Sequence, residues 1–568
     1  MSKQSTILLA AFFLIVSTVA ASASDHKPRT SQKKQSEIRI SATLAGPTQE
    51  TIDEARSRIE QSDVFQKEIS GKKIRFFSTE YVENGTSTPT RIRAIYYDYS
   101  SDNAVVAETD LAGGVPVSVS RQYLQPIPND AEIEEARKII AADNSLGVSI
   151  SSGTLKVFRP MPPITILSGT TERLVNVGLK APDSGKTEIV SVSISRGLVV
   201  RYPSGAPSTA VSAADACGIP DAFQERTIRG TAGSLDFTVR DGSNNVLWEM
   251  NITRPSVSGG TNGSGIELRN VKYKGKTVFK RAHVPILDVH YVNDACGPYR
   301  DWQFDEGMFD APAAGANDSF PGFRILASGQ VAKTALENGT DVGNFKGVAI
   351  YAQGLEAVMV TEMEAGWYRY IMEWRFAADG TIRPRFGFGG TQNNCICITH
   401  HHHVYWRFDF DVVSPTNRVY QMERGRKFLQ PILTEMNRNK SIQTNRRLLI
   451  QNSNGDEAYM LIPNLFDGVV DAFGVNDFWV LRYKNVVGGS TVQNEIDDGV
   501  DAFVAGPPSS INITPYVNGE SLLNQDVVVW YGAQFLHEDG DAPINAERSP
   551  KVLSGDHVVG PDLRPVRW

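Results

Sequence analysis

Residues 400–411 read His400-His-His-His-Val-Tyr-Trp-Arg-Phe-Asp-Phe-Asp411, with four consecutive histidines leading into aromatic and apolar residues. Such a run favours a β-strand, whose side chains point alternately to its two faces. His400 and His402 are therefore expected on one face, where two imidazoles at this spacing form half of a copper or zinc site. A solvated polar strand is the alternative. The opposite face would carry the other side chains of this chemistry: His401, His403, Asp409 and Asp411.

A second strand-like run near the C-terminus, Asp526-Val-Val-Val-Trp-Tyr-Gly-Ala-Gln-Phe-Leu-His537, carries polar residues at both ends. His537 is one of only two histidines after the cluster and can complete a three-histidine site. Asp526 can join Asp409 and Asp411 in a separate site with oxygen ligands, which suits calcium or another hard cation. The two strands together predict two metal sites of different ligand chemistry.

These two strands resemble segments of the copper amine oxidase family. In that family a His-x-His pair runs without a gap into Arg-x-Asp-x-Asp, and a later strand brings an aspartate and a third histidine at the same spacing. The resemblance implies a type 2 copper held by His400, His402 and His537. It also implies a peripheral cation, calcium or manganese, held by three carboxylates and two backbone carbonyls: Asp409, Asp411, Asp526, Phe410 and Val527.

The segment from Trp367 to Ile382 resembles the surroundings of the family's cofactor tyrosine, which copper and oxygen convert into topaquinone. The corresponding residue is Tyr368. Tyr291 and Asp305 stand at the family's spacing for the tyrosine that hydrogen-bonds the quinone and for the catalytic base. The resemblance therefore implies a homodimeric oxidase that uses oxygen to convert primary amines into aldehydes, with release of hydrogen peroxide and ammonia.

Some residues around the quinone position depart from the family's pattern. Trp367 replaces the asparagine before the cofactor tyrosine, and Arg369 replaces the acidic residue after it. Gln303 stands where a gating tyrosine is common in the family. The stretch from Tyr368 to His400 is shorter than is usual in the family. Three alternatives stay open. They are a copper-binding pseudoenzyme without the quinone, a copper protein with other redox chemistry, and a secreted β-sandwich binding protein with an incidental histidine strand.

The four cysteines fall into two groups along the sequence. Cys217 and Cys296 each lie in an Asp-Ala-Cys-Gly string, and after export we expect them to form a disulfide bond between linker and catalytic domain. Cys395 and Cys397 lie too close in sequence for an unstrained disulfide to be assumed. They are candidates for a copper-loading site, for the redox pair of the second alternative, or for buried apolar residues.

The N-terminus has the pattern of an export signal. Lys3, an apolar run over 7–16 and the small residues Ala21-Ser-Ala23 predict a signal peptide over 1–23, with a membrane anchor as the alternative. The mature protein is expected to be secreted or periplasmic and to have no later membrane span. A flexible leader is expected over 24–45.

A repeat follows the leader: Thr51-Ile-Asp-Glu-Ala-Arg-Ser-Arg-Ile59 returns as Glu132-Ile-Glu-Glu-Ala-Arg-Lys-Ile-Ile140. Both copies follow a proline and a polar capping residue and precede strand-like runs, which predicts small α+β modules over 46–127 and 128–205. A linker over 206–232 leads to short apolar runs separated by Gly, Asn, Asp and Pro. This pattern predicts a large all-β antiparallel sandwich over 233–568 as the catalytic domain.

Length and charge agree with this organisation. The 568 residues exceed one ordinary domain, and the formal net charge is −7. Because no block of basic residues stands out, we expect no nucleic-acid partner.

Overall fold

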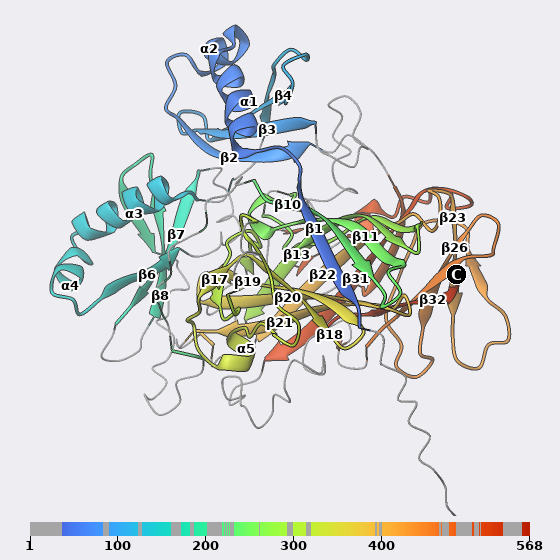
Figure 1. Cartoon of the computed structure of the whole chain (residues 1–568). Helices are drawn as coiled ribbons and strands as arrows, with labels where there is room; N and C mark the ends of the chain where they lie inside the picture. Colours follow the sequence, from blue (N-terminus) through green and yellow to red (C-terminus); the bar gives the residue numbers. More distant parts are fainter. Residues whose placement is uncertain are drawn as a thin grey trace, which may run out of the picture. The chain divides into compact units, whose positions relative to one another are not determined.

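The computed structural model consists mainly of antiparallel β-strands (Figure 1). The expected signal peptide lies outside the residues that the structure describes. The described residues are 37–82, 90–122, 126, 128–160, 172–181, 187–201, 218–220, 222, 224, 227, 232–260, 262–291, 299–313, 320–391, 395–396, 400–464, 467–468, 476–483, 503–504, 510–511, 513–537 and 559–568.

Two small α+β modules precede the large sheets, as the sequence repeat predicts. Each has two helices and a four-stranded antiparallel sheet with its strands in chain order. The first contains α1 (Gln49–Gln61), α2 (Asp63–Ile69), β2 (Ile74–Val82), β3 (Arg91–Asp98), β4 (Asn103–Asp110) and β5 (Ser118–Gln122). The second contains α3 (Asp130–Ala142), α4 (Gly147–Ser151), β6 (Lys156–Pro160), β7 (Leu174–Lys180), β8 (Thr187–Ser193) and β9 (Leu198–Arg201).

The repeat is explained by matching helix caps and matching buried faces. Thr48 caps α1 by accepting a hydrogen bond from the backbone N–H of Thr51, and Asn129 caps α3 in the same way. Both helices bury an Ile, an Ala and an Ile at the same spacing, one face of an α-helix. These residues are Ile52, Ala55 and Ile59 in α1, and Ile133, Ala136 and Ile140 in α3.

The end of the expected flexible leader is part of the large structure. β1 (Arg39–Ala45) pairs antiparallel with β10 (Ser234–Arg240) at the edge of a sheet. Ile40 and Ala42 alternate with polar residues and pack against the main hydrophobic core. This alternation is typical of a half-buried strand, so the leader prediction is corrected for residues 39–45.

Most of the remaining strands form two ten-stranded sheets. All strand pairings in these sheets are antiparallel except that of β16 with β18. The first sheet runs β1, β10, β11 (Val246–Thr253), β12 (Glu267–Tyr273), β13 (Lys276–Tyr291), β22 (His400–Phe410), β31 (Val527–His537), β28 (Phe478–Arg482) and β25 (Met436–Arg438), with β14 (Tyr299–Arg300) beside β13. The second runs β16 (Phe323–Ile325), β18 (Val348–Gln353), β19 (Glu356–Ala365), β20 (Tyr368–Ala377), β21 (Ile382–Gly390), β32 (Asp562–Arg567), β27 (Ala458–Ile462), β26 (Arg447–Asn452), β23 (Asn417–Met422) and β24 (Gln430–Ile432).

Short elements complete the described structure. They are α5 (Ala335–Asn338), β15 (Met308–Phe309), β17 (Phe345–Lys346), β29 (Phe503–Val504), β30 (Ser510–Ile511) and the 3-10 turns Pro255–Val257 and Thr514–Tyr516. No helix among the described residues has both the length and the apolar character needed to cross a membrane.

The strand β22 separates two hydrophobic cores. Its even-numbered residues, such as Trp406, face the second sheet, and the ring of Trp406 contacts that of Phe386 on β21. Its odd-numbered residues, such as Tyr405, pack with Trp479 and Trp530 in a smaller cluster on the other side of the first sheet. The two faces are called the inner face and the outer face below. The predicted α+β modules and large antiparallel sandwich are confirmed.

Candidate metal centre

The histidine cluster forms the first four residues of β22, and β22 lies between β13 and β31 in the sheet. His400 and His402 are fully buried on the inner face, and their ring centroids lie 4.8 Å apart. The backbone of His537 lies directly opposite His400 in the register of β22 and β31. The side chain of His537 lies outside the described part of the chain, so its ligand role remains a prediction.

Tyr368 meets this pair from the opposite sheet. It is the first residue of β20, and its hydroxyl is hydrogen-bonded to Nε2 of His400. Its ring also contacts the ring of His402 edge-on, with the centroids 4.7 Å apart. Three buried side chains from two facing sheets therefore meet at one point. The sequence alone shows them only as two separate segments.

Tyr291 holds the same tyrosine from the end of β13. Its hydroxyl donates to the hydroxyl of Tyr368 at 3.3 Å, and its ring stacks on that of His400 at 4.7 Å. Burial raises the pKa of Tyr291, although hydrogen bonds with Tyr368 and Trp367 oppose the shift. Tyr291 therefore keeps its proton near neutral pH and stays a hydrogen-bond donor.

Trp367 joins this chain of hydrogen bonds. Its indole Nε1–H donates to the hydroxyl of Tyr291 at 3.2 Å, and its side chain is fully buried. The sequence identifies Trp367 only as a bulky replacement beside the cofactor position. In the structure it instead positions the tyrosine that contacts Tyr368.

Arg369 lies on the other side of β20 from the site, since neighbouring residues of a strand point to opposite faces. Its guanidinium donates to both carboxylate oxygens of Asp341, and one further N–H donates to the backbone carbonyl of Tyr368 at 2.8 Å. Both members of this ion pair are fully buried. The positive charge is therefore compensated by Asp341.

Asp305 lies near the strand next to Tyr368. Its backbone carbonyl accepts from the N–H of Glu364 on β19 at 2.7 Å, one position before the residue that pairs with Tyr368. Its carboxylate is buried and accepts a hydrogen bond from the backbone N–H of Thr227 at 2.7 Å. Asp305 thus has a fixed carboxylate one strand away from the tyrosine.

Two aromatic residues at this site were missed by the sequence analysis. Tyr370 stacks on Tyr368 with ring centroids 5.4 Å apart, and its hydroxyl donates to Asp301. Phe388 contacts the ring of His402 at 4.5 Å. Alternation along β20 places Tyr370 on the face of Tyr368 and was a signal that could have found it.

The three predicted aspartates of the second site come together at the far end of β22. Carboxylate oxygens of Asp409, Asp411 and Asp526 lie within 4.8 Å of one another. Burial raises the pKa of Asp411 to about 6 and that of Asp526 to about 7, the latter also because Asp411 is negatively charged. Burial likewise raises the pKa of Asp409, which Arg407 opposes. A bound cation would relieve this repulsion.

The two residues expected to supply carbonyl ligands to that site lie opposite each other on neighbouring strands. Phe410 and Val527 are direct partners in the register of β22 and β31. The carbonyl of Phe410 accepts a hydrogen bond from the side chain of Asn417 at 3.2 Å. Their contribution to a cation site stays a prediction.

Among the cysteines, the structure describes only Cys395, which is buried and disulfide-bonded. A disulfide sulfur offers no thiolate, the form that binds metals. This removes Cys395 as a copper ligand in the oxidised protein. Cys217, Cys296 and Cys397 lie outside the described residues, so the expected pairing of Cys217 with Cys296 remains a prediction.

Compared by sequence, the chain matches no protein-family model and no curated protein. Solved structures match it along most of its length. A copper-containing benzylamine oxidase from Hansenula polymorpha has a TM-score of 0.54 at 14% identity, covering 90% of this chain and 96% of that one. An Aspergillus nidulans amine oxidase has a TM-score of 0.53 at 14% identity, covering 91% and 87%. Pichia pastoris lysyl oxidase has 0.53 at 12% identity, covering 91% and 88%.

The matched portion is too long to be the sandwich alone. Coverage of about 90% of the chain takes in the small α+β modules as well as the two large sheets. TM-scores of 0.53–0.54 establish a common fold, whereas identities of 12–14% leave the activity to be argued from the site. This chain adopts the fold of the copper amine oxidases.

Proposed function

We propose that this protein is a divergent copper amine oxidase. It would convert a primary amine, oxygen and water into an aldehyde, ammonia and hydrogen peroxide. His400, His402 and His537 would hold copper, and Tyr368 would be the precursor of topaquinone. The observation that carries the proposal is the hydrogen bond between the hydroxyl of Tyr368 and Nε2 of His400.

The residues present fit a copper ion. Two buried imidazoles share one strand face, and a third histidine lies opposite His400 on the neighbouring strand. Imidazole is a suitable ligand for copper, and three imidazoles leave coordination positions open for water and oxygen. A tyrosine that already contacts one ligand is well placed for oxidation at such an ion.

Copper and topaquinone, when present, supply the electron sink for the amine and the reaction with oxygen. The protein's own residues would do the rest. Tyr291, itself held by Trp367, fixes the oxygen of Tyr368 through its hydroxyl proton. The carboxylate of Asp305 would accept the proton from the carbon that bears the amine. Burial of the whole group keeps bulk water away from the reacting atoms.

A copper-binding pseudoenzyme of the same fold is the second candidate. The ring of Tyr368 is stacked against Tyr370, and its hydroxyl is held on both sides by Tyr291 and His400. Such a constrained ring would serve equally well as a permanent neighbour of copper that is never oxidised. The two candidates differ only in the chemical state of Tyr368.

The deciding experiment starts from metal-free full-length protein. Copper and oxygen are added, and the visible spectrum is followed before and after phenylhydrazine, which traps a quinone carbonyl. The amine oxidase predicts a visible band, a shift with phenylhydrazine, and peroxide formation with simple primary amines. Tyr368→Phe is the matched control, because it removes one hydroxyl and should bind copper without forming a band.

Peptide mass then identifies the modified residue. An unmodified Tyr368 in fully copper-loaded protein would reject the oxidase and leave the pseudoenzyme. A protein that binds no copper would reject both candidates.

We also propose three further properties, which rest on the sequence patterns and the family resemblance described above. The acidic group at the end of β22 would bind calcium or manganese. Calcium titrations of the wild type and of Asp409→Asn would test this. The chain would be exported after signal-peptide cleavage, which N-terminal sequencing of the mature protein would test. It would be a homodimer, and light scattering that gives the mass of a single chain at micromolar concentration would contradict this.

A further inference from the structure

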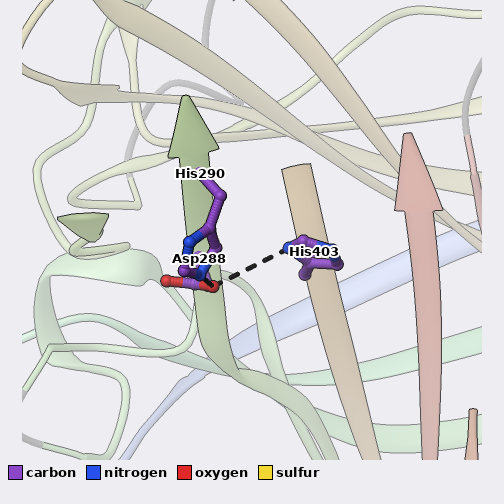
Figure 2. Close-up of side chains that lie close together, drawn as sticks. All are labelled: Asp288, His290 and His403. Atoms are coloured by element: carbon purple, nitrogen blue, oxygen red, sulfur yellow. Dashed lines mark ion pairs between the residues drawn. The ribbon is translucent and has the colours of Figure 1, made fainter. Parts of the chain in front are cut away.

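A second group of metal-ligand side chains lies on the outer face of the same sheet. Asp288 and His290 come from β13, and His403 comes from β22 (Figure 2). Asp288 is the direct cross-strand partner of His403. All three side chains are essentially fully buried. Figure 2 shows them directed towards one another from the two neighbouring strands.

One carboxylate oxygen lies between the two imidazoles. Oδ2 of Asp288 is 2.6 Å from Nε2 of His290 and 3.7 Å from Nδ1 of His403. The ring centroids of the two histidines lie 5.7 Å apart. Among the residues that the structure describes, none donates a hydrogen bond of normal geometry to either oxygen of Asp288. A fully buried carboxylate in this state is costly unless a cation compensates it.

The separations are close to those expected for ligand atoms around a shared ion. Nitrogen and oxygen ligands bind Zn²⁺ at about 2.0–2.2 Å, so neighbouring ligand atoms lie about 3–3.5 Å apart in the coordination sphere. The two measured separations lie on either side of this range. Two histidines with one carboxylate are also a recurrent donor set for Zn²⁺ and for non-haem Fe²⁺. A calcium ion would instead require mostly oxygen ligands.

We propose that Asp288, His290 and His403 form a second transition-metal site, for a borderline divalent ion such as Zn²⁺ or Fe²⁺. This site lies on the opposite face of β22 from His400 and His402. It is separate from the proposed copper centre and from the acidic group of Asp409, Asp411 and Asp526. It does not depend on amine oxidation, because its ligands take no part in the proposed reaction.

His401 gives the site a natural control. It is the cross-strand partner of His290, and its ring is nearly parallel to that of His403 at 6.2 Å. It is only partly buried, and it is outside the group whose ligand atoms lie within 4.8 Å of one another. Replacing His401 therefore removes an imidazole from the same face without removing one of the three ligands.

The test is zinc binding to full-length protein whose copper site has been filled with one equivalent of copper and whose acidic site is saturated with calcium. Zinc alone is the probe, measured by calorimetry and by metal analysis after gel filtration. We expect one further zinc per chain in the wild type and in His401→Gln. We expect that zinc to be lost, or bound at least about tenfold more weakly, in His403→Gln and Asp288→Asn.

Cobalt gives an independent readout, because its visible absorption depends on the ligands that surround it. The wild type with cobalt in place of zinc should develop visible bands that Asp288→Asn lacks. Retained copper and an unchanged near-ultraviolet circular dichroism spectrum show that a variant is folded. If the copper-filled wild type binds no further zinc, or if His403→Gln and Asp288→Asn bind it as tightly as the wild type, the proposal is wrong.

Discussion

The inner and outer faces of β22 carry different chemistry on alternate residues of one strand. On the inner face, His400 and His402 contact aromatic rings, and the hydroxyl of Tyr368 is hydrogen-bonded to His400. On the outer face, His403 lies near the carboxylate of Asp288. The carboxylates of Asp409, Asp411 and Asp526 lie together at the other end of the strand. Imidazoles without carboxylates suit copper, whereas added carboxylates favour harder divalent ions.

Period-two alternation can separate two metal chemistries without separating them in sequence. Neighbouring residues of β22 belong to different hydrophobic cores, so each ion would have its own surroundings. Substitutions on the two faces should therefore have separable effects.

Removing an inner-face histidine should abolish copper binding. His402→Ala is expected to reduce copper from about one equivalent per chain to background, and with it all quinone formation, because two histidines cannot replace three. His401→Ala is the matched control on the outer face and should keep its copper. Metal analysis decides this prediction, and the reverse pattern, with copper lost in His401→Ala and kept in His402→Ala, would overturn the assignment of the faces.

Asp305→Asn should slow the enzyme without removing its metal. Loss of a general base typically lowers the rate by about 10²–10⁴-fold, and we expect a fall in kcat of this size with copper and the quinone band unchanged. Asp310→Asn, five residues along and exposed, is the control. Steady-state kinetics with a simple amine measures the effect. A fall of less than about tenfold would show that another group takes the proton.

Tyr291→Phe should have a smaller effect on the inner face. It removes the hydroxyl that donates to Tyr368 and accepts from Trp367, while the ring can still stack on His400. One hydrogen bond is worth about 1 kcal/mol, so kcat should fall about fivefold. Copper content should not change. A normal kcat in this variant would show that stacking alone positions the tyrosine.

The smallest effect is a pH dependence on the outer face. The folded-state pKa values of Asp411 and Asp526, about 6 and about 7, lie above the ordinary value of 3.8. Protonation therefore favours the folded state of the cation-free protein, and this contribution is lost as pH rises through about 6 to 7.

Asp526→Asn, a neutral isostere, should accordingly melt higher than the wild type in the absence of calcium, by a difference that grows between pH 5 and pH 7 and reaches about 2 °C at pH 8. Thermal unfolding in chelator measures the difference. Saturating calcium should reverse its sign at pH 8, since the wild type then has the better cation site. An equal melting temperature at both pH values would contradict the raised pKa.

Part of the inner site follows from the sequence because it depends on local rules. The alternation of 400–411 assigns each histidine to a face, and the same rule would have placed Arg369 on the far side of β20 from Tyr368. The capped helices of the two modules follow in the same way from Thr48 and Asn129. Alternation also appears in residues 39–45, although the polar residues before them favour a leader.

The outer site does not follow from the sequence because it depends on the register between distant strands. The pairing of β13 with β22 shifts between His283 and Ile286, next to Pro285. A shift of one residue moves every later side chain to the other face, so the position of Asp288 depends on this bulge. Arg369 pairs with Asp341, which lies outside any helix or strand. This pairing could not be predicted from the sequence either.

The most direct test of the two-face account is anomalous diffraction from crystals loaded with one equivalent each of copper and zinc, recorded at both absorption edges. The account predicts a copper peak on the inner face, bound by His400 and His402 beside Tyr368, and a zinc peak on the outer face at Asp288, His290 and His403. A copper peak at the outer group, or both metals on the same face of β22, would contradict it.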